Sequence, residues 1–429
     1  MGMGGPRSRC RAPGRIRLHA QPAGVEIVTN ARPPQKPVPQ DFAAAAPYTA
    51  PMDITERLRA LIACNSVSSV NAELDQGNRG VIDLLANWAA DLGFAVEIQP
   101  LADPRKANLI ATLGQGPGGL VLAGHADTVP CEPALWRSDP FVLQADDACY
   151  RGLGVCDMKG FFALALAAAE RCARSRLGEP LILLATADEE SSMAGAQALV
   201  AAGRPHARRA LIGEPTGMKP VAAHKGILVE RLRIRGRSGH SSDPERGANA
   251  LHTLHRALGV LRDFARELAA RGRDPRFAVD HSTLNLGCAR AGDNPNRICG
   301  HAELGFEIRP LPGVDLEALR AELEERLLPL GEADGTGVAI DHLIVPPFAA
   351  AEDSALVALC EELTGHARTA VAFATEAPYL RALGLDVTVL GPGDIDQAHQ
   401  PDESLPRARV APMVDLLETL IARSCLADY

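Results

Sequence analysis

The sequence lacks the features that mark several classes of protein. Its ten cysteines include no pair at CxxC spacing, which argues against a zinc ribbon or a disulfide framework and fits reduced thiols in a cytoplasmic protein. No apolar run is long enough to span a bilayer. The net charge is −9, and no basic stripe recurs after the first fifty residues. We therefore expect neither a membrane nor a nucleic-acid partner.

The first 51 residues differ in composition from the rest of the chain. They are rich in arginine, proline and glycine, poor in acidic residues, and carry no apolar core of a secretory signal. Such a segment cannot bury enough apolar surface to fold, so residues 1–51 are expected to be a disordered N-terminal extension. It could resemble a transit peptide, but serine is sparse. We favour an upstream start codon, with Met52 as the true beginning.

What remains is long enough for at least two domains. A hydrophobic fraction of 46% with 23% charged residues is ordinary for a globular protein. Strand and helix patterns alternate from residue 53 to about 225, and the same rhythm returns after Pro347. This alternation predicts an α/β fold with a mostly parallel, doubly wound sheet and helices on both faces.

The pattern changes near Gly226. Residues 227–234 alternate apolar and charged side chains, as a half-exposed antiparallel strand does. The following segments read as strand, helix, strand, strand, helix, strand, which is typical of a ferredoxin-like α+β unit. We therefore expect a catalytic domain formed by 52–225 and 344–429, split by an inserted domain over 226–343.

The chain is organised around the stretch GHADTVP at 124–130, which follows a buried apolar strand. In α/β sheets, ligands bind at the carboxyl ends of the strands. His125 and Asp127 are two residues apart and point to the same side of an extended strand. A histidine beside a carboxylate suits a metal ligand with the group that orients it.

More candidate ligands follow other strands or lie in loops of the parallel part: Asp157, Glu189, Glu190, Glu214 and His399. Taken singly, each has an ordinary interpretation as a helix cap or a solvated loop residue. Their joint occurrence on the carboxyl side of the strands predicts convergence on one sheet edge. Oxygen and imidazole ligands around a shared carboxylate suit a dinuclear hydrolytic site with zinc, cobalt or manganese.

Four motifs carry a family resemblance: GHADTVP (124–130), GLGVCDMKGFF (152–162), ADEE (187–190) and GEPT (213–216). They resemble the zinc-dependent amidohydrolases, which include acetylornithine deacetylases, succinyl-diaminopimelate desuccinylases, aminoacylases and carboxypeptidases. The resemblance covers about residues 53–425 and implies a zinc aminopeptidase-like catalytic domain. Three longer stretches are similar to the acetylornithine deacetylase branch, namely 136–141, 296–313, and 375–380 with 391–406.

The resemblance implies two divalent metal ions, most simply zinc, with cobalt as an alternative. One ion would be held by His125, Asp157 and Glu214. The other would be held by Asp157, Glu190 and His399, so that Asp157 bridges the two.

The same resemblance assigns roles beside the metals. Glu189 takes the position of the general base, and Asp127 takes that of the partner behind His125. In the family, the peptide bond that corresponds to Asp157–Met158 is cis.

The inserted domain resembles the family's lid and dimerisation domain. His240, in RSGHSSDPERGANA (237–250), matches a histidine that reaches the active site of the partner subunit and donates to the developing oxyanion. Asn296 and Arg309 match the residues that bind the substrate carboxylate, a role that suits the bidentate guanidinium. A homodimer through the inserted domain is therefore implied, whereas His224 is interpreted as structural.

The resemblance to the acetylornithine deacetylase branch implies hydrolysis of the N2-acetyl amide of N-acetyl-L-ornithine, a step of arginine biosynthesis. One alternative is the same chemistry on N-succinyl-diaminopimelate, acetylcitrulline or a dipeptide, because one methylene contributes only about 1–3 kcal/mol of discrimination. Another alternative is a metal-binding protein of this fold without catalysis. The intact base and ligand positions argue against it.

Overall fold

The computed structural model describes residues 53–172 and 177–426. The predicted disordered extension, 1–51, lies outside these residues. Within them, the strands form one large sheet, one four-stranded sheet and one small three-stranded sheet.

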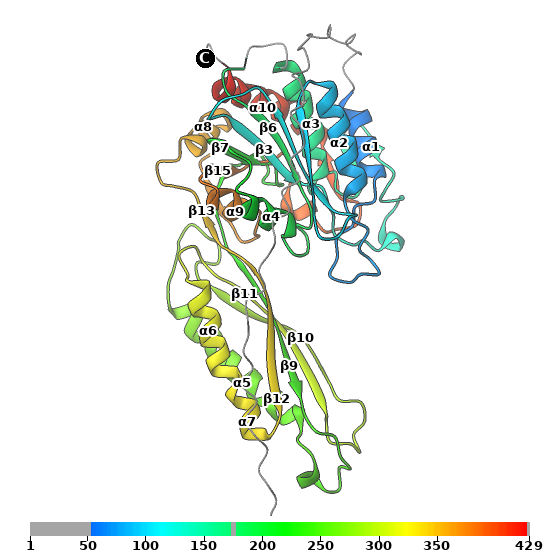
Figure 1. Ribbon diagram of the computed structural model, residues 1–429, viewed down its shortest axis with the longest axis vertical. Helices are drawn as coiled ribbons and strands as arrows, with labels where there is room; N and C mark the ends of the chain where they lie inside the picture. Colours follow the sequence, from blue (N-terminus) through cyan, green and yellow to red (C-terminus); the bar gives the residue numbers. More distant parts are fainter. Residues whose placement is uncertain (1–52, 173–176, 427–429) are drawn as a thin grey trace, which may run out of the picture. The chain divides into compact units, whose positions relative to one another are not determined.

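The large sheet forms the frame of the site (Figure 1). Its nine strands run in the order β1-β2-β6-β3-β7-β15-β8-β13, with β14 also paired to β8. Their bounds are β1 Ala95–Pro100, β2 Ala107–Leu113, β3 Leu120–His125, β6 Leu181–Thr186, β7 Arg209–Ile212, β8 Val221–His224, β13 Phe348–Ala349, β14 Thr369–Val371 and β15 Asp386–Val389.

The centre of this sheet is parallel. Strand β3 pairs in parallel with β6 on one side and with β7 on the other, and β15 extends the parallel part beyond β7. The outer strands β1 and β2 are antiparallel to each other, and β2 is antiparallel to β6. Only residues 101–106 connect β1 to β2, which is too short for the crossover that a parallel pair requires. The predicted α/β class with a mostly parallel central sheet is confirmed.

Helices pack on both faces of the large sheet. Successive side chains of a strand point to opposite faces, and in the central strands both sets are apolar, so each face needs a covering layer. In β3, Leu120 and Leu122 join the core under α1, α2, α3, α8 and α10, whereas Val121 and Ala123 join the core under α4 and α9. The bounds are α1 Ile54–Ala63, α2 Arg79–Asp91, α3 Lys159–Cys172, α4 Ala194–Ala202, α8 Ala355–Thr364, α9 Ala377–Ala382 and α10 Val410–Cys425.

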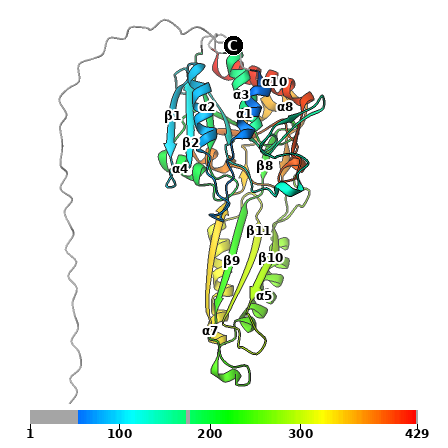
Figure 2. The same cartoon turned by 90° about the vertical axis from the view of Figure 1, so that its right-hand side faces the viewer.

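The segment from 227 to 345 forms the four-stranded sheet, in the order β10-β11-β9-β12 with all neighbours antiparallel. This is the ferredoxin-like arrangement that the sequence predicts. Figure 2 shows its strands beside α5. The bounds are β9 Ile227–Arg235, α5 Ala250–Ala270, β10 Thr283–Ala291, β11 His301–Arg309, α6 Leu316–Leu327, α7 Pro329–Asp334 and β12 Gly337–Val345.

Two features of the structure differ from what the sequence predicts. The residue pattern predicts a long helix from Pro244 to about Ala269, but α5 begins only at Ala250, because Pro244–Arg246 forms a separate 3-10 turn and the Asn249 side chain caps α5 by accepting from Leu251 N. The small sheet, β16-β5-β4, was not anticipated. Its strands, β4 Gln144–Ala145, β5 Cys149–Arg151 and β16 Ser404–Pro406, are too short for a readable alternation of side chains.

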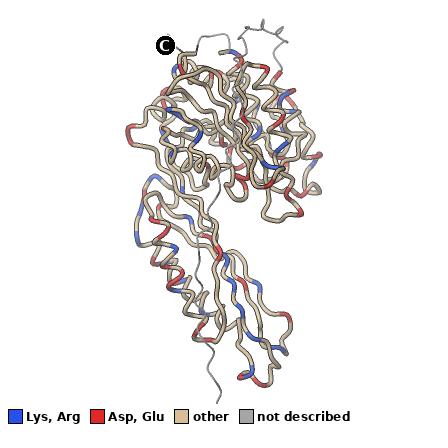
Figure 3. The backbone as a smooth tube through the Cα atoms, viewed as in Figure 1, with Lys and Arg blue, Asp and Glu red and all other residues tan. Residues whose placement is uncertain are grey.

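The described residues show neither a segregation of charge along the chain nor a membrane-spanning helix. Figure 3 shows acidic and basic residues interspersed along the backbone of the described part of the chain. None of the helices in 53–172 or 177–426 combines the length and the apolar character that a membrane crossing needs.

Candidate functional site

The candidate ligands come from neighbouring strands of the parallel part. His125 ends β3, Glu189 and Glu190 follow β6, and Glu214 follows β7. His399 lies in the segment that follows β15. Because β6, β3, β7 and β15 are neighbours and run in the same direction, their carboxyl ends lie along one edge of the sheet. Parallel pairing therefore brings together residues that are distant in sequence.

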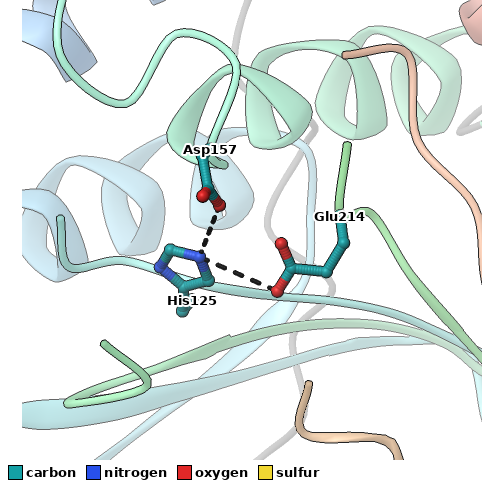
Figure 4. Close-up of side chains that lie close together, drawn as sticks. All are labelled: His125, Asp157 and Glu214. Atoms are coloured by element: carbon teal, nitrogen blue, oxygen red, sulfur yellow. Dashed lines mark hydrogen bonds and ion pairs between the residues drawn. The ribbon is translucent and has the colours of Figure 1, made fainter. Parts of the chain in front are cut away.

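The first group of candidate ligands is buried. His125 Nε2 lies 3.1 Å from Asp157 Oδ1 and 3.8 Å from Glu214 Oε1. Figure 4 shows the imidazole of His125 facing both carboxylates. Asp157 comes from the loop before α3, and its peptide bond to Met158 is cis, as the resemblance implies. One histidine nitrogen and two carboxylates in this arrangement could hold a divalent metal ion.

The second group shares Asp157 with the first. His399 Nε2 lies 3.4 Å from Asp157 Oδ2 and 3.1 Å from Glu190 Oε1. The two oxygens of Asp157 therefore face different histidines, Oδ1 toward His125 and Oδ2 toward His399. This is the geometry that a carboxylate bridging two metals requires. The His399 side chain is 54% exposed, so the second group lies at the mouth of the site.

Glu189 stands beside both groups. Its carboxylate belongs to a third set, with His125 and Glu190, whose ligand atoms lie within 4.8 Å of one another. Burial, followed by the charges of Glu214 and Glu190, raises the pKa of the Glu189 carboxyl well above its usual range, although His125 opposes the shift. A carboxyl with a raised pKa next to a metal position has the properties of a general base.

Asp127 connects His125 to the loop that carries Glu189. Its backbone carbonyl accepts from His125 Nδ1 at 3.0 Å, whereas its carboxylate lies 3.7 Å from the same nitrogen. The carboxylate accepts hydrogen bonds from the backbone N–H groups of Glu189 and Glu190, at 3.3 and 3.1 Å. Asp127 thus orients the imidazole mainly through its backbone, and it holds the loop of Glu189 and Glu190 through its side chain.

The site concentrates negative charge in a buried space. Burial raises the pKa of Glu214 well above its usual value. Burial opposes ionisation of Asp157 as well, but hydrogen bonds from His125 and His399 hold the pKa of its carboxyl below the usual range. Hydrogen bonds to Asp157 and Glu190 raise the pKa of His399 to about 10. Buried carboxylates in excess of cations are costly, and divalent ions would offset that cost, so the donor set fits metals.

The three candidate residues of the inserted segment lie elsewhere. Of the groups that could hold a metal in the described part of the chain, none includes His240, Asn296 or Arg309. His240 and Asn296 line one cavity of about 360 Å³, with His240 Nδ1 2.8 Å from Ser242 Oγ. Arg309 lines another, of about 300 Å³, and forms an ion pair with Glu307 at 2.6 Å. The structure therefore does not bring these three residues together with the ligands.

His224, interpreted as structural, is fully buried in β8. Its Nδ1 bonds to the carbonyl of Lys225 at 2.8 Å, and its Nε2 accepts from Thr375 N at 3.3 Å. Both ring nitrogens are therefore used within the fold.

Several buried polar residues near the candidate ligands were not predicted from the sequence. Lys106 donates to Asp188, the residue before Glu189, and Glu403 accepts from the loop that carries Asp157. Glu376 is buried, and burial raises the pKa of its carboxyl to about 7. The motif resemblance at 375–380 and 391–406 included Glu376 and Glu403 but assigned them no role. No comparable signal marks Lys106, which stands next to Arg105 just before a buried strand.

Comparison with known proteins places this geometry in a family. The model of peptidase family M20/M25/M40 matches residues 121–423. The chain is 44% identical over 376 residues to the acetylornithine deacetylase of Proteus mirabilis, covering 87% of this chain and 97% of that protein.

Two solved structures share the fold at low sequence identity. An M20 family metallo-carboxypeptidase from Sulfolobus solfataricus superposes with a TM-score of 0.70 at 16% identity, covering 86% of this chain and 99% of the other. A dinuclear metal-binding peptidase of the M20 family from Bacillus subtilis gives a TM-score of 0.58 at 13% identity, covering 86% and 97%. The match of the family model, the identity to the curated relative and the metal-ligand geometry agree, and the chain belongs to peptidase family M20/M25/M40.

Proposed function

We propose that this protein is a metal-dependent amidohydrolase that cleaves the N2-acetyl amide of N-acetyl-L-ornithine to acetate and L-ornithine, a step of arginine biosynthesis in the cytoplasm. The main support for the proposal is the position of Asp157, because one of its carboxylate oxygens faces His125 and the other faces His399. The choice of substrate is supported by the 44% identity to an acetylornithine deacetylase over nearly the whole of that protein.

Two divalent metal ions would occupy the two groups, one at His125, Asp157 and Glu214, the other at Asp157, Glu190 and His399. Nitrogen and oxygen donors without thiolate favour zinc, with cobalt as the alternative. Bound there, the metals would supply a lowered pKa for the attacking water and polarisation of the acyl oxygen.

Proton transfer falls to Glu189. Its carboxylate accepts the proton of the attacking water and then returns it to the leaving amine as the tetrahedral intermediate collapses. Asp127 supports this step, because hydrogen bonds from the N–H groups of Glu189 and Glu190 hold the base-bearing loop against His125. The surroundings of Glu189 raise the pKa of its carboxyl, and such a shift favours a carboxyl that both accepts and releases a proton during turnover.

The remaining roles belong to the inserted domain, 226–343, with the catalytic domain formed by 52–225 and 344–429. His240 would donate to the developing oxyanion from the partner subunit of a homodimer. Asn296 and Arg309 would bind the substrate carboxylate. That His240 is exposed and apart from the ligands supports action on another subunit rather than on its own site.

The test of the activity is acetate release from N-acetyl-L-ornithine, with and without a chelator, followed by addition of zinc or cobalt. N-succinyl-diaminopimelate, acetylcitrulline and a dipeptide are measured side by side. We expect the highest kcat/KM for acetylornithine, by about tenfold or more. A higher value for another substrate would overturn the substrate assignment. Failure of the metal-loaded protein to hydrolyse any of the four would contradict the enzyme assignment.

Subunit mixing tests the role of His240. A Glu189→Gln chain and a His240→Ala chain are each expected to be nearly inactive. If His240 acts across the dimer, random exchange of subunits restores about a quarter of the wild-type activity, because half of the dimers are mixed and each has one complete site. Absence of any recovery in verified mixed dimers would place His240 outside the partner's site.

A further inference from the structure

Glu403 is a buried carboxylate with an unusual set of partners. It is 2% exposed, and its carboxylate accepts three backbone hydrogen bonds. Oε1 accepts from the N–H groups of Cys156 at 2.7 Å and Asp157 at 2.9 Å, and Oε2 accepts from Gly154 N at 2.8 Å. One side chain therefore holds the backbone of the loop that ends at Asp157.

The backbone around Glu403 holds the same loop. The carbonyl of Glu403 accepts from Gly152 N at 3.1 Å, and β16 pairs with β5 through Ser404 and Arg151. The segment that enters the Asp157 loop is thereby paired to the segment that leaves Glu403. The backbone contacts hold the start of the loop against the Glu403 segment. The Glu403 carboxylate holds the rest of the loop by accepting from its N–H groups.

Glu403 also belongs to the segment that carries a ligand of the second metal group. It follows His399 by four residues, and Asp157 and His399 face each other across 3.4 Å. A change in the contacts of Glu403 would therefore alter the distance between these two ligands. By contrast, His125 and Glu214 are positioned by the ends of β3 and β7, which do not depend on Glu403.

The chemistry of the loop requires a carboxylate. Buried N–H groups need acceptors, and three of them converge here. A carboxylate offers several lone pairs and no competing donor, whereas an amide replaces one oxygen by an NH2 group. Glycine at 154 has φ +83°, a conformation that brings the N–H groups of the turn toward one anion.

We propose that Glu403 is a positioning residue that fixes Asp157 relative to His399 and thereby sets the affinity of the second metal site. The inference rests on the proposed dinuclear site. It makes a specific prediction, namely that the two sites respond unequally to loss of the carboxylate. The first site keeps His125 and Glu214 in place, while the second depends on Asp157 and His399 together.

The experiment compares the full-length wild-type protein with Glu403→Gln. Each protein is stripped of metal and titrated with zinc alone by calorimetry, and the cobalt-loaded forms are compared by visible absorption. For Glu403→Gln we expect the second binding constant to fall about 10- to 100-fold while the first changes by less than about threefold. The cobalt spectrum should change in the increment that belongs to the second equivalent.

Asp386→Asn is the matched control. Asp386 is also a carboxylate that accepts locally, from Ser354 Oγ at 2.5 Å and Leu356 N at 3.0 Å, but it lies at the start of β15, opposite the ligand edge. Its replacement should lower stability without changing either zinc constant. Glu403→Asp, which keeps both acceptor oxygens, should retain more of the second affinity than Glu403→Gln and serves if the glutamine variant does not fold.

Three outcomes would overturn the inference. Wild-type constants in Glu403→Gln would show that the carboxylate does not position the ligands. Equal weakening of both sites, in step with a loss of stability, would reduce Glu403 to a structural role. A wild-type protein that binds fewer than two zinc ions would overturn the dinuclear site itself. The titration of the wild-type protein shows this result before any variant is measured.

Discussion

Lys106 Nζ donates to Asp188 Oδ1 over 2.7 Å, directly before the proposed base Glu189 in the sequence. The same nitrogen donates to Asp75 Oδ1 over 2.8 Å, and Ser68 Oγ also donates to Asp188 Oδ1. Asp188 has φ +61°, a left-handed conformation that costs a non-glycine residue of order 1–3 kcal/mol. The buried ammonium of Lys106 thus anchors the start of the base-bearing loop in an unfavourable backbone conformation.

Replacing Lys106 by methionine should therefore affect both stability and turnover. The substitution leaves Asp188 buried without its cation and leaves Asp75 with Arg105 alone, which costs about 3–5 kcal/mol of unfolding free energy. We expect kcat to fall about tenfold or more, because the loop that holds Glu189 loses its anchor. Urea unfolding and steady-state kinetics measure the two effects.

Arg105→Met is the matched control for Lys106. Arg105 is the neighbouring residue and pairs with the same Asp75 at 2.9 Å, but its side chain is 50% exposed. An exposed ion pair contributes about 0–1 kcal/mol, so this variant should stay close to the wild type in both measurements. Equal effects of the two substitutions would refute the anchoring role of Lys106.

Glu189→Gln tests the base. Glutamine has nearly the same shape but cannot accept the proton of the attacking water. We expect kcat to fall by about 10²–10⁴. Metal content, measured by elemental analysis, should remain at two ions per chain, since the candidate ligands of both metal groups are unchanged. Wild-type turnover in this variant would assign the base to another residue.

Removal of the metals should lower the melting temperature as well as the activity. Without cations, the carboxylates around His125 repel one another in a buried space. Zinc at 100 times its dissociation constant adds about 2.7 kcal/mol of stability per site, which corresponds to a rise of roughly 3–4 °C for a chain of this length. Differential scanning fluorimetry of the stripped protein with added zinc measures the rise. Magnesium, which prefers six oxygen ligands, is the control and should give a smaller shift. A melting temperature that does not respond to zinc would argue against the metal groups.

The gathering of candidate ligands at one edge of the sheet could be predicted from the sequence, because it depends on short local patterns. A polar residue after an apolar strand is visible in the sequence, and parallel strands bring their carboxyl ends together. His125, Glu190 and Glu214 lie together in the structure for this reason. The antiparallel outer strands could be deduced only from the short connection between β1 and β2, and the mostly parallel prediction did not use it.

The supporting residues could not be predicted, because their partners are set by tertiary structure. Glu403 binds backbone N–H groups about 250 residues earlier in the chain, and every residue type has such groups except proline. Lys106 meets Asp188 only because β2 and β6 are neighbours. The sequence predicted that the carboxylate of Asp127 orients His125. Whether the backbone carbonyl or the carboxylate of Asp127 makes the shorter contact with His125 depends on the exact path of the loop.

In the four-stranded sheet, Glu230 on β9 is buried on the core side. It is 1% exposed, and within the described residues neither of its carboxylate oxygens has a hydrogen-bond partner. Burial, together with the charge of Glu324, raises the pKa of this carboxyl to about 7, although Arg320 lowers it. His342 lies opposite Glu230 on β12. The folded state therefore favours the protonated form of Glu230.

The sign of the pH dependence follows from the raised pKa. The unfolded chain ionises this carboxyl near its usual value of 4.5, whereas the folded protein keeps the proton up to about pH 7. Stability is therefore lost as pH rises from 4.5 through 7, by an amount on the order of 3 kcal/mol. Glu230→Gln removes the titration, so the variant should gain stability over the wild type at pH 8 and little at pH 4.5.

Urea unfolding of both proteins at pH 4.5 and pH 8 measures this difference, and other titrating groups cancel in the comparison. Glu303→Gln, at an exposed position of the neighbouring strand β11, is the control and should show the same small effect at both pH values. If the advantage of Glu230→Gln is equal at the two pH values, Glu230 is ionised in the folded protein throughout, and an unseen partner must satisfy it.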